Sequence, residues 1–438
     1  MWCQVLNFCI PIGVRKNSGP GTLQKEHMSS VVKRFLHYTA FDTQSVEGTG
    51  LVPSSGGQFL LAHDVAEEMK TMGMMDVSVD GHAYVMGTLP ANTAKKKVPT
   101  VGFIAHLDTS TEISGANVKA RVVSNYDGGD ILLNEEQNVV LSPKDFPELE
   151  SYKGEDLIVT DGTTLLGVDD KGGMAQIMTA VEYLIAHPEI EHGAVKICFT
   201  PDEEIGHQAA YLDIEAFGAD FAYTVDGGPV GELNYETFNG AKAVITIHGR
   251  NVHPGTAKGK MINAALIGAE CVSMFPQKET PAETENYEGF YHLLSFRGDV
   301  EKAELEYIIR DHDVERFEER KAFVKETILS LQQKYGFRVI GCSLRDQYYN
   351  MAGKIRGAMY IVEIAEKAMK KAGVNPTVVP VRGGTDGSSL SQRGLLTPNL
   401  FTGGHNYHGR FEYVPVFALE KGVEVIVNII ANICGARS

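Results

Sequence analysis

The sequence predicts an α/β fold, in which a domain built on a doubly wound, mostly parallel sheet is interrupted by an inserted ferredoxin-like α+β lid domain. Three observations predict this fold. Short, continuous apolar runs are typical of strands buried on both faces of a sheet. Amphipathic segments alternate with these runs towards both ends of the 438-residue chain, as expected for a parallel sheet covered by helices. The middle of the chain instead follows the order strand-helix-strand-strand-helix-strand of the ferredoxin-like arrangement.

The composition is that of an ordinary globular protein. Hydrophobic residues make up 43% and charged residues 22% of the chain, and 40 basic against 56 acidic side chains give a net charge of −16. No apolar stretch reaches the length of roughly 18 residues that a membrane helix requires, so we expect no membrane partner. The negative charge repels phosphate backbones and makes nucleic acid a poor partner. The six cysteines form no C-x-x-C pair, which favours reduced thiols in a cytoplasmic protein.

Residues 1–27 differ from the sequence that follows and are predicted to be a largely disordered extension. The short apolar stretch at their start carries its positive charges on the wrong side for a signal peptide, although a cleaved targeting segment stays as an alternative. Ser30 is predicted to be the N-cap of a helix whose apolar face includes Val31, Phe35 and Leu36. The natural start is therefore expected close to Met28.

Residues 28–233 are predicted to form the first part of the sheet domain. Their apolar spacing predicts a helix over residues 60–72. A second helix is expected from near Gly172, with an apolar face formed by Met174, Ile177, Met178, Val181 and Leu184. The buried strands are expected at residues 98–105, 157–160, 194–200 and 221–225.

Residues 234–345 are predicted to be the inserted domain, and residues 346–438 to complete the sheet domain. In the insert, strands are expected at residues 241–248, 291–297, 304–310 and 337–344, and helices at residues 261–274 and 315–335. After the insert, helices are expected at residues 355–372 and 416–433, and strands at residues 377–381 and 399–401.

Histidine and acidic residues follow five of the expected strands. They are His106 and Asp108, Asp169 and Asp170, Glu203 and Glu204, Asp226, and His405 with His408. In an open α/β sheet, ligands bind beyond the carboxyl ends of the strands. Histidine and carboxylate ligands without cysteine favour zinc, manganese or cobalt, and the two histidines argue against calcium. Because these ligands are too many for one tetrahedral zinc, we expect two metal ions bridged by one carboxylate.

Seven motifs carry these and neighbouring residues in a characteristic order. Among the most specific are His106-x-Asp108, Thr200-Pro-Asp-Glu-Glu204, Tyr223-Thr-Val-Asp-Gly-Gly228, Arg382-Gly-Gly-Thr-Asp-Gly387 and Asn406-Tyr-His-Gly409. With them, the chain resembles the peptidase T family of zinc-dependent aminotripeptidases, within the broader aminoacylase/carboxypeptidase group of co-catalytic zinc hydrolases. The resemblance implies a metallo-exopeptidase that hydrolyses the N-terminal peptide bond of short peptides, preferentially tripeptides.

The resemblance also implies a role for each metal ligand. Asp169 is implied to bridge two divalent ions, most simply zinc. His106 and Asp226 would complete one metal site, and Glu204 and His408 the other.

Three further features around the metals follow from the same resemblance. A cis peptide bond is implied between Asp169 and Asp170. Asp108 is implied to accept a hydrogen bond from the outer N–H of His106, which fixes the tautomer of that ring. Glu203 is implied to take a proton from the metal-bridging water and to deliver it to the leaving amine. Capping of the following helix is the alternative role of Glu203.

Four more residues are candidates for contact with the substrate. Arg382 suits a bidentate grip on a peptide carboxylate, or else an ion pair with Asp386. By resemblance, His253 is implied to donate a hydrogen bond in the transition state once the inserted domain closes. Asn239 and Arg310 are weaker candidates.

Other functions stay open at this point. A dipeptidase or an N-acyl amino-acid deacylase would use the same metals with different lid contacts. A non-catalytic binding protein on the same scaffold would have lost metal ligands, whereas the full set is present here. A nucleotide-binding oxidoreductase would need a G-x-G-x-x-G motif after its first strand, which the sequence lacks. A homodimer is compatible with the sequence, but no pattern requires one.

Overall fold

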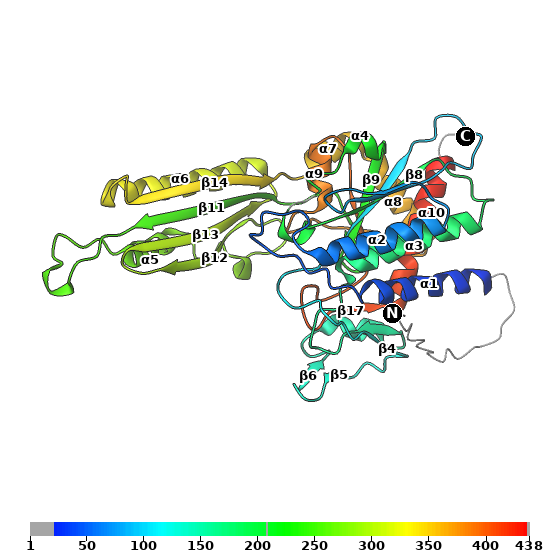
Figure 1. Ribbon diagram of the computed structural model, residues 1–438, viewed down its shortest axis with the longest axis horizontal. Helices are drawn as coiled ribbons and strands as arrows, with labels where there is room; N and C mark the ends of the chain where they lie inside the picture. The colour runs from blue at the N-terminus through cyan, green and yellow to red at the C-terminus, as the bar shows by residue number, and fades with distance from the viewer. Residues whose placement is uncertain (1–21, 207–208, 436–438) are drawn as a thin grey trace, which may run out of the picture.

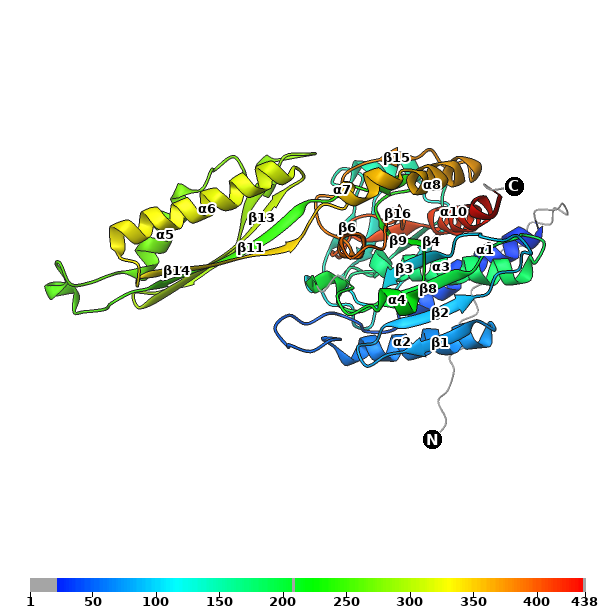
Figure 2. The same ribbon diagram turned by 90° about the horizontal axis from the view of Figure 1, so that it is seen from above.

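The computed structural model describes residues 22–206 and 209–435. It divides into two parts that follow one another along the long axis of the molecule (Figure 1). The larger part carries an eight-stranded sheet, and the smaller part carries a four-stranded sheet with two helices. Figure 2 shows the narrow connection between them, formed by the chain leading into β11 (Asn239–His248) and out of β14 (Ile340–Tyr348).

The eight-stranded sheet has a parallel centre. In spatial order its strands are β1 (Met75–Val79), β2 (Val85–Leu89), β8 (Val195–Thr200), β3 (Val101–His106), β9 (Phe221–Gly227), β16 (Asn399–Phe401), β10 (Glu232–Asn234) and β15 (Thr377–Val378). β8, β3, β9 and β16 are parallel neighbours. Antiparallel β2 and β10 flank this centre on its two sides. The predicted mostly parallel sheet is confirmed for the strands that end in histidine and acidic residues.

Helices cover both faces of this sheet, as the doubly wound fold predicts. One face is covered by α1 (Thr22–Tyr38), α2 (Gly56–Thr71), α3 (Val168–Ala186), α8 (Tyr360–Lys371) and α10 (Val416–Gly435). The other face is covered by α4 (Ile214–Phe217) and α9 (Asp386–Gln392). Side chains alternate between the two faces along a strand, and accordingly Phe103 packs in the first core while Ile104 packs in the second. Both faces of β3 are therefore buried, which explains its continuous apolar sequence.

Helix α3 begins at Val168, four residues before its predicted start, and its predicted apolar face is buried. The two glycines in its first turns allow it to lie close to the strand ends. A Cβ atom on Gly173 would lie 2.0 Å from the carbonyl oxygen of Val225 in β9. Only glycine permits so close an approach of helix and sheet.

The predicted strand at residues 157–160 is real but belongs to another sheet. β7 (Leu157–Val159) pairs antiparallel with β4 (Arg121–Val123) and β17 (Tyr413–Pro415). The hairpin β5 (Ile131–Asn134) and β6 (Val139–Leu141) packs in the same small core. The expectation that residues 157–160 lie in the main sheet was therefore wrong. A three-residue apolar strand has the same sequence pattern in either sheet, so its partner is decided by tertiary packing.

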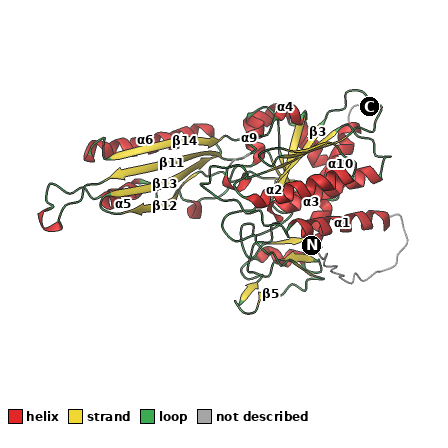
Figure 3. Cartoon of the chain, in the orientation of Figure 1, coloured by secondary structure: helices red, strands yellow, loops and turns green. Residues whose placement is uncertain are grey.

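The four-stranded sheet has the predicted ferredoxin-like arrangement. Its strands are antiparallel in the order β12 (Phe290–Gly298), β13 (Lys302–Asp311), β11 and β14, with α5 (Ala264–Met274) and α6 (Val314–Tyr335) packed against them in a separate core. Figure 3 shows these strands and both helices set apart from the main sheet. β14 continues to Tyr348, three residues beyond the boundary expected at residue 345. The exact division of the chain into domains stays a prediction.

Several predicted boundaries differ from the structure. Ser30 is not an N-cap, because α1 already begins at Thr22 and the Ser30 hydroxyl donates to Glu182 Oε2 at 2.9 Å. Residues 22–27 of the expected extension are therefore helical, and the rest of that extension lies outside the described residues. The helix expected from residue 355 is split into α7 (Ala352–Ile355) and α8. In the part of the chain that the structure describes, no helix is long and apolar enough to cross a membrane.

Candidate metal centre

Five side chains predicted to bind metal meet at the carboxyl edge of the parallel strands. His106 is the last residue of β3, and Asp226 lies near the end of β9. Glu204 lies in a three-residue 3-10 helix directly after β8. Asp169 lies in the first turn of α3, and His408 lies on the loop between β16 and β17. The common direction of the strands places their ends together although the residues are far apart in the sequence.

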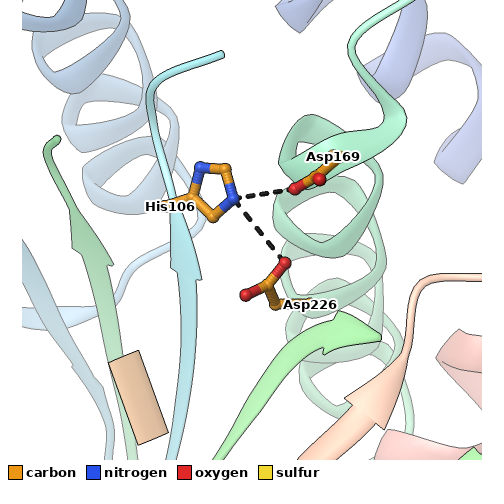
Figure 4. Close-up of side chains that lie close together, drawn as sticks. All are labelled: His106, Asp169 and Asp226. Atoms are coloured by element: carbon orange, nitrogen blue, oxygen red, sulfur yellow. Dashed lines mark hydrogen bonds and ion pairs between the residues drawn. The ribbon is translucent and has the colours of Figure 1, made fainter. Parts of the chain in front are cut away.

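The first group consists of His106, Asp169 and Asp226, and Figure 4 shows the three side chains pointing toward one another. Nε2 of His106 lies 2.8 Å from Oδ1 of Asp169 and 3.6 Å from Oδ1 of Asp226. The three side chains come from β3, α3 and β9, and all are largely buried.

The second group consists of Asp169, Glu204 and His408. Nε2 of His408 lies 3.2 Å from Oδ2 of Asp169 and 3.1 Å from Oε2 of Glu204. Asp169 therefore belongs to both groups and turns one carboxylate oxygen to each histidine. This is the arrangement of a carboxylate that can bridge two cations.

The donor atoms fit a pair of divalent cations. Within each group they lie within 4.8 Å of one another, and imidazole nitrogen with carboxylate oxygen is a donor set that zinc accepts. Oε1 of Glu204 is buried and has no hydrogen-bond partner among the described residues. A buried polar atom of this kind costs free energy unless a partner satisfies it, and a cation beside Glu204 is such a partner.

Burial and neighbouring negative charges raise the proton affinity of three carboxylates at this edge, whereas His106 and His408 outweigh burial and lower the pKa of Asp169. Burial raises the pKa of Glu203 well above its ordinary value, and the charge of Asp226 adds to the shift. Burial, reinforced by Asp169, raises the pKa of Glu204 to about 8, and burial raises the pKa of Asp226 to about 6. Burial alone would lower the pKa of His106, but its carboxylate neighbours outweigh burial and raise it. Cations reverse these shifts because they favour the charged carboxylates.

Each histidine also meets an acidic residue at its second ring nitrogen. Nδ1 of His106 lies 3.0 Å from the carbonyl oxygen of Asp108 and 3.4 Å from its carboxylate. Nδ1 of His408 lies 3.5 Å from Oε1 of Glu112, and hydrogen bonding to His408 lowers the pKa of Glu112 to about 2. Such partners fix the orientation and tautomer of a metal-binding imidazole. Asp108 lies beside His106, but the hydrogen bond of Nδ1 is to its backbone carbonyl, and the predicted role of its carboxylate stays a prediction. Glu112, on an irregular loop, had no sequence signal.

Glu203 is held at the same edge by its backbone. Its N–H donates to Oδ1 of Asp108 at 3.0 Å. The preceding residue, Asp202, has a φ of 57°, a left-handed conformation that non-glycine residues rarely adopt. The Asp202 carboxylate accepts hydrogen bonds from the N–H and the hydroxyl of Ser54 at 2.7 and 2.5 Å. Glu203 is the first residue of its 3-10 helix, and Asp202 occupies the N-cap position. The alternative in which Glu203 only stabilises the start of a helix stays a prediction.

The peptide bond between Asp169 and Asp170 is cis, as the resemblance implied. The buried carboxylate of Asp170 accepts hydrogen bonds from the N–H of His106 at 3.1 Å and from the N–H of Gly173 at 3.2 Å. Asp170 therefore joins the end of β3 to the start of α3. Its position beside Asp169 was visible in the sequence, but this structural role was not.

Arg382 does not form the predicted alternative ion pair with Asp386. The Asp386 carboxylate is buried and accepts a hydrogen bond from the hydroxyl of Thr200 at 2.5 Å. The Arg382 guanidinium instead donates to backbone carbonyl groups of the smaller part, those of Thr284 (3.2 Å), Asn286 (2.9 Å) and Glu288 (2.8 Å). Arg382 thus stabilises the junction between the two parts by hydrogen bonds. Its binding of a substrate carboxylate stays a prediction.

The two weaker candidates for substrate contact are engaged with the protein itself. Nδ2 of Asn239 donates to the carbonyl groups of Asp311 at 2.9 Å and His312 at 3.1 Å, and its Oδ1 accepts from the N–H of Asn350 at 2.9 Å. Nη1 of the buried Arg310 donates to two backbone carbonyl groups of the four-stranded sheet. The amide of Asn239 has no free role in binding in this arrangement, because its donor and acceptor hold the junction.

The structure does not bring His253 to the metal-binding groups. β11 begins at the junction with Asn239 and ends at His248, and ten strand residues span about 30 Å. His253 follows on the loop beyond that far end, where its Nδ1 accepts a hydrogen bond from the N–H of Gly255 at 3.1 Å. Its predicted transition-state role is not visible within this chain.

The chain belongs to peptidase family M20/M25/M40, whose model matches residues 153–432. Within that family, its similarity is to enzymes named peptidase T. Peptidase T of Clostridium novyi (strain NT) is 59% identical over 403 residues, which cover 92% of this chain and 99% of the relative. Peptidase T of Geobacillus thermodenitrificans (strain NG80-2) is 58% identical over 400 residues, 91% of this chain and 97% of the relative. The predicted resemblance to the peptidase T family is confirmed, and the chain is a peptidase.

Solved structures share the whole architecture. The aminopeptidase PepT from Bacillus cereus ATCC 10987 aligns with a TM-score of 0.72 at 24% identity, covering 93% of this chain and 99% of that one. A tripeptidase from Staphylococcus aureus aligns with a TM-score of 0.73 at 21% identity, again covering 93% and 99%. At these identities the likeness establishes the fold, a main α/β sheet domain with an inserted smaller domain.

Proposed function

We propose that this chain is a metal-dependent aminotripeptidase, which hydrolyses the N-terminal peptide bond of short peptides. The observation that carries the proposal is the position of Asp169, with Oδ1 2.8 Å from Nε2 of His106 and Oδ2 3.2 Å from Nε2 of His408. A carboxylate between two imidazoles, each with a second carboxylate beside it, suits two divalent ions. The name peptidase T, carried by relatives 55–59% identical to this chain, supports the reaction class.

Each ion has its own ligands in this proposal. His106 and Asp226 would hold one ion, Glu204 and His408 the other, and Asp169 both. Zinc suits these donors best, while manganese and cobalt accept the same ligand types. When bound, such ions lower the pKa of a water molecule toward neutrality and polarise the peptide carbonyl group.

Glu203 would carry the proton between the two halves of the reaction. Glu203 is half-buried and the charge of Asp226 acts on its carboxyl group, while its neighbour Glu204 is turned toward His408. The Glu203 carboxylate takes a proton from the attacking water as the new C–O bond forms. The same carboxyl group then gives that proton to the amine nitrogen as the C–N bond breaks. One residue thereby serves as base and then as acid, and ends the cycle in its starting state.

The two alternative reactions use the same centre and differ in the ends of the substrate. A dipeptidase would prefer the shorter peptide, and an N-acyl amino-acid deacylase would accept an acylated amine. An aminotripeptidase requires a free ammonium group at the first residue and two residues after the cleaved bond.

A peptide-length panel tests the proposal. Hydrolysis of a free tripeptide is compared with that of the matching dipeptide, tetrapeptide and N-acetylated tripeptide, before and after chelation and after addition of zinc, manganese or cobalt. We expect the highest kcat/KM on the free tripeptide, no activity after chelation, and recovery with added metal. Full activity in the chelated protein would refute the metal mechanism, and a preference for the dipeptide or the acetylated peptide would select an alternative.

A further inference from the structure

The carboxylate of Glu412 is buried against the start of α3. Its side chain is 1% exposed. Oε2 accepts hydrogen bonds from the backbone N–H groups of Leu166 at 2.6 Å and Gly167 at 2.8 Å, and Oε1 accepts from those of Val168 at 2.8 Å and Asp169 at 3.4 Å. One carboxylate thus receives four successive N–H groups from a segment more than 240 residues away in the sequence.

Three of these N–H groups, those of Gly167, Val168 and Asp169, belong to the N-cap and the first turn of α3, and Leu166 directly precedes the N-cap. The first N–H groups of a helix point away from its carbonyl groups and need an outside acceptor. A carboxylate is a strong acceptor for them, because a charged partner strengthens the hydrogen bond. Although burial raises the pKa of Glu412 to about 7, the N–H groups of Gly167 and Leu166 oppose that shift. Glu412 therefore fixes the backbone that carries Asp169.

Glu412 also belongs to the loop that carries His408. The backbone groups of His405 and Tyr413 close this loop with two hydrogen bonds of 2.9 and 3.2 Å. Within the closed loop, the N–H of Glu412 donates to the carbonyl of Gly409 at 3.2 Å. His408 and Glu412 are thereby held on one compact unit, and Glu412 attaches that unit to the turn of Asp169.

We propose that Glu412 is the positioning residue that sets His408 against Asp169. The distance of 3.2 Å between Nε2 of His408 and Oδ2 of Asp169 is then fixed by a contact outside the ligand set. The inference rests on the proposed metal centre, because its consequence is preorganisation of one metal site. Groups that orient metal ligands typically change metal affinity by roughly 10–100-fold. A carboxylate that only capped α3 would change folding stability and leave metal affinity as it was.

The test compares Glu412→Gln with Glu68→Gln in the full-length protein. Glutamine keeps the size of the side chain but turns one acceptor oxygen into an NH2 group that faces N–H donors. Glu68 is a matched control because it also joins separate segments, accepting hydrogen bonds from Arg34 and Tyr38 at 2.5 Å, and lies outside the metal centre. Zinc is titrated into each metal-free protein in competition with a chromophoric chelator, which gives the number of ions bound and the Kd of each.

We expect Glu412→Gln to weaken the binding of one of the two zinc ions roughly 10–100-fold. We expect Glu68→Gln to lower the Tm without changing either Kd. Wild-type zinc Kd values for both ions in folded Glu412→Gln would overturn the positioning role. A wild-type protein that binds fewer than two ions would instead overturn the proposed dinuclear centre, so the two failures are distinguishable.

A second measurement does not use the metal. Hydrogen exchange of the metal-free proteins reports on the amides of residues 166–169. We expect these amides to exchange faster in Glu412→Gln and as in the wild type in Glu68→Gln. Should Glu412→Gln not fold, Glu412→Asp keeps the charge but shortens the side chain. We then expect faster exchange at the same amides and a lower affinity for one zinc ion than in the wild type. Unchanged exchange and unchanged affinity in Glu412→Asp would then overturn the proposal.

Discussion

The carboxylate of Asp108 accepts a hydrogen bond from the backbone N–H of Glu203, with 3.0 Å between Oδ1 and N. Its Oδ2 accepts from the N–H of Glu204 at 3.1 Å and from the hydroxyl of Ser45 at 2.5 Å. The same side chain lies 3.4 Å from Nδ1 of His106. One buried carboxylate therefore lies beside a proposed metal ligand and holds the turn that carries the proposed base.

Replacing Asp108 with Asn tests this double role. Asparagine offers one acceptor oxygen, and its NH2 group would face an N–H donor, so we expect kcat/KM to fall roughly 10–100-fold. The control is Asp213→Asn, which alters a comparable carboxylate at the N-cap of α4, where it accepts from the N–H of Ala216. The two variants are compared in steady-state hydrolysis of a tripeptide. Equal kcat/KM in Asp108→Asn and the wild type would contradict the prediction.

Glu203→Gln separates proton transfer from metal binding. Glutamine cannot take the proton, so we expect kcat to fall roughly 10²–10⁴-fold while two ions per chain remain bound. Glu204→Gln is the companion variant, since loss of a ligand should release one ion. Elemental analysis beside kcat distinguishes the two. Retained turnover in Glu203→Gln, or a loss of metal that explains its inactivity, would remove Glu203 from the proposed role.

Because of buried His405, we expect the folding stability of the protein to fall in acid. Burial lowers the pKa of His405 to about 4, and its Nε2 lies 2.6 Å from the hydroxyl of Tyr152. The unfolded chain, with a histidine pKa near 6.5, binds the proton first. The stability from neutral His405 is therefore complete above pH 6.5 and is lost as the pH falls toward 4.

The expected loss between pH 7 and pH 5 is about 2 kcal/mol. Urea unfolding of the metal-free protein measures it without interference from released ions. In His405→Gln, the difference between the free energies of unfolding at pH 7 and at pH 5 should be smaller by that amount. An identical pH dependence of the free energy of unfolding in both proteins would show that His405 does not titrate on unfolding.

Arg382→Ala distinguishes bracing of the junction from recognition of the substrate. Its guanidinium donates to three carbonyl groups of residues 284–288, so we expect the KM to rise roughly tenfold as these hydrogen bonds are lost. The rise should be equal for a free tripeptide and for its C-terminal amide. An increase in KM for the free tripeptide alone, and not for its amide, would instead support the predicted binding of the substrate carboxylate by Arg382. Arg382→Lys, which retains the charge but not the planar fork, should recover only part of the effect.

The proposed ligands were predictable because parallel strands order them. His106, Glu204 and Asp226 each stand at or just beyond the end of a strand of the parallel centre. Strands that run in one direction present these ends at one edge, so sequence position was enough to place them together. The ferredoxin-like insert was equally predictable, because few folds have its order of strands and helices.

Contacts made by irregular segments were not predictable. Glu112 and Glu412 reach His408 and the start of α3 from loops without periodicity. Asn239 and Arg382 were predicted to contact substrate, yet their hydrogen bonds stabilise the junction between the two parts. A polar side chain has the same sequence signature whether its partner is a peptide substrate or a carbonyl group of its own chain.

The order of residues alone determined which side chains of this peptidase share one edge, because chain direction and burial on both strand faces follow from apolar runs. Folding in three dimensions decided which sheet β7 joins, which acid orients each imidazole, and which N–H groups Glu412 receives. Those choices depend on distances between segments far apart in the chain. Such distances follow from packing the whole molecule and not from any local pattern.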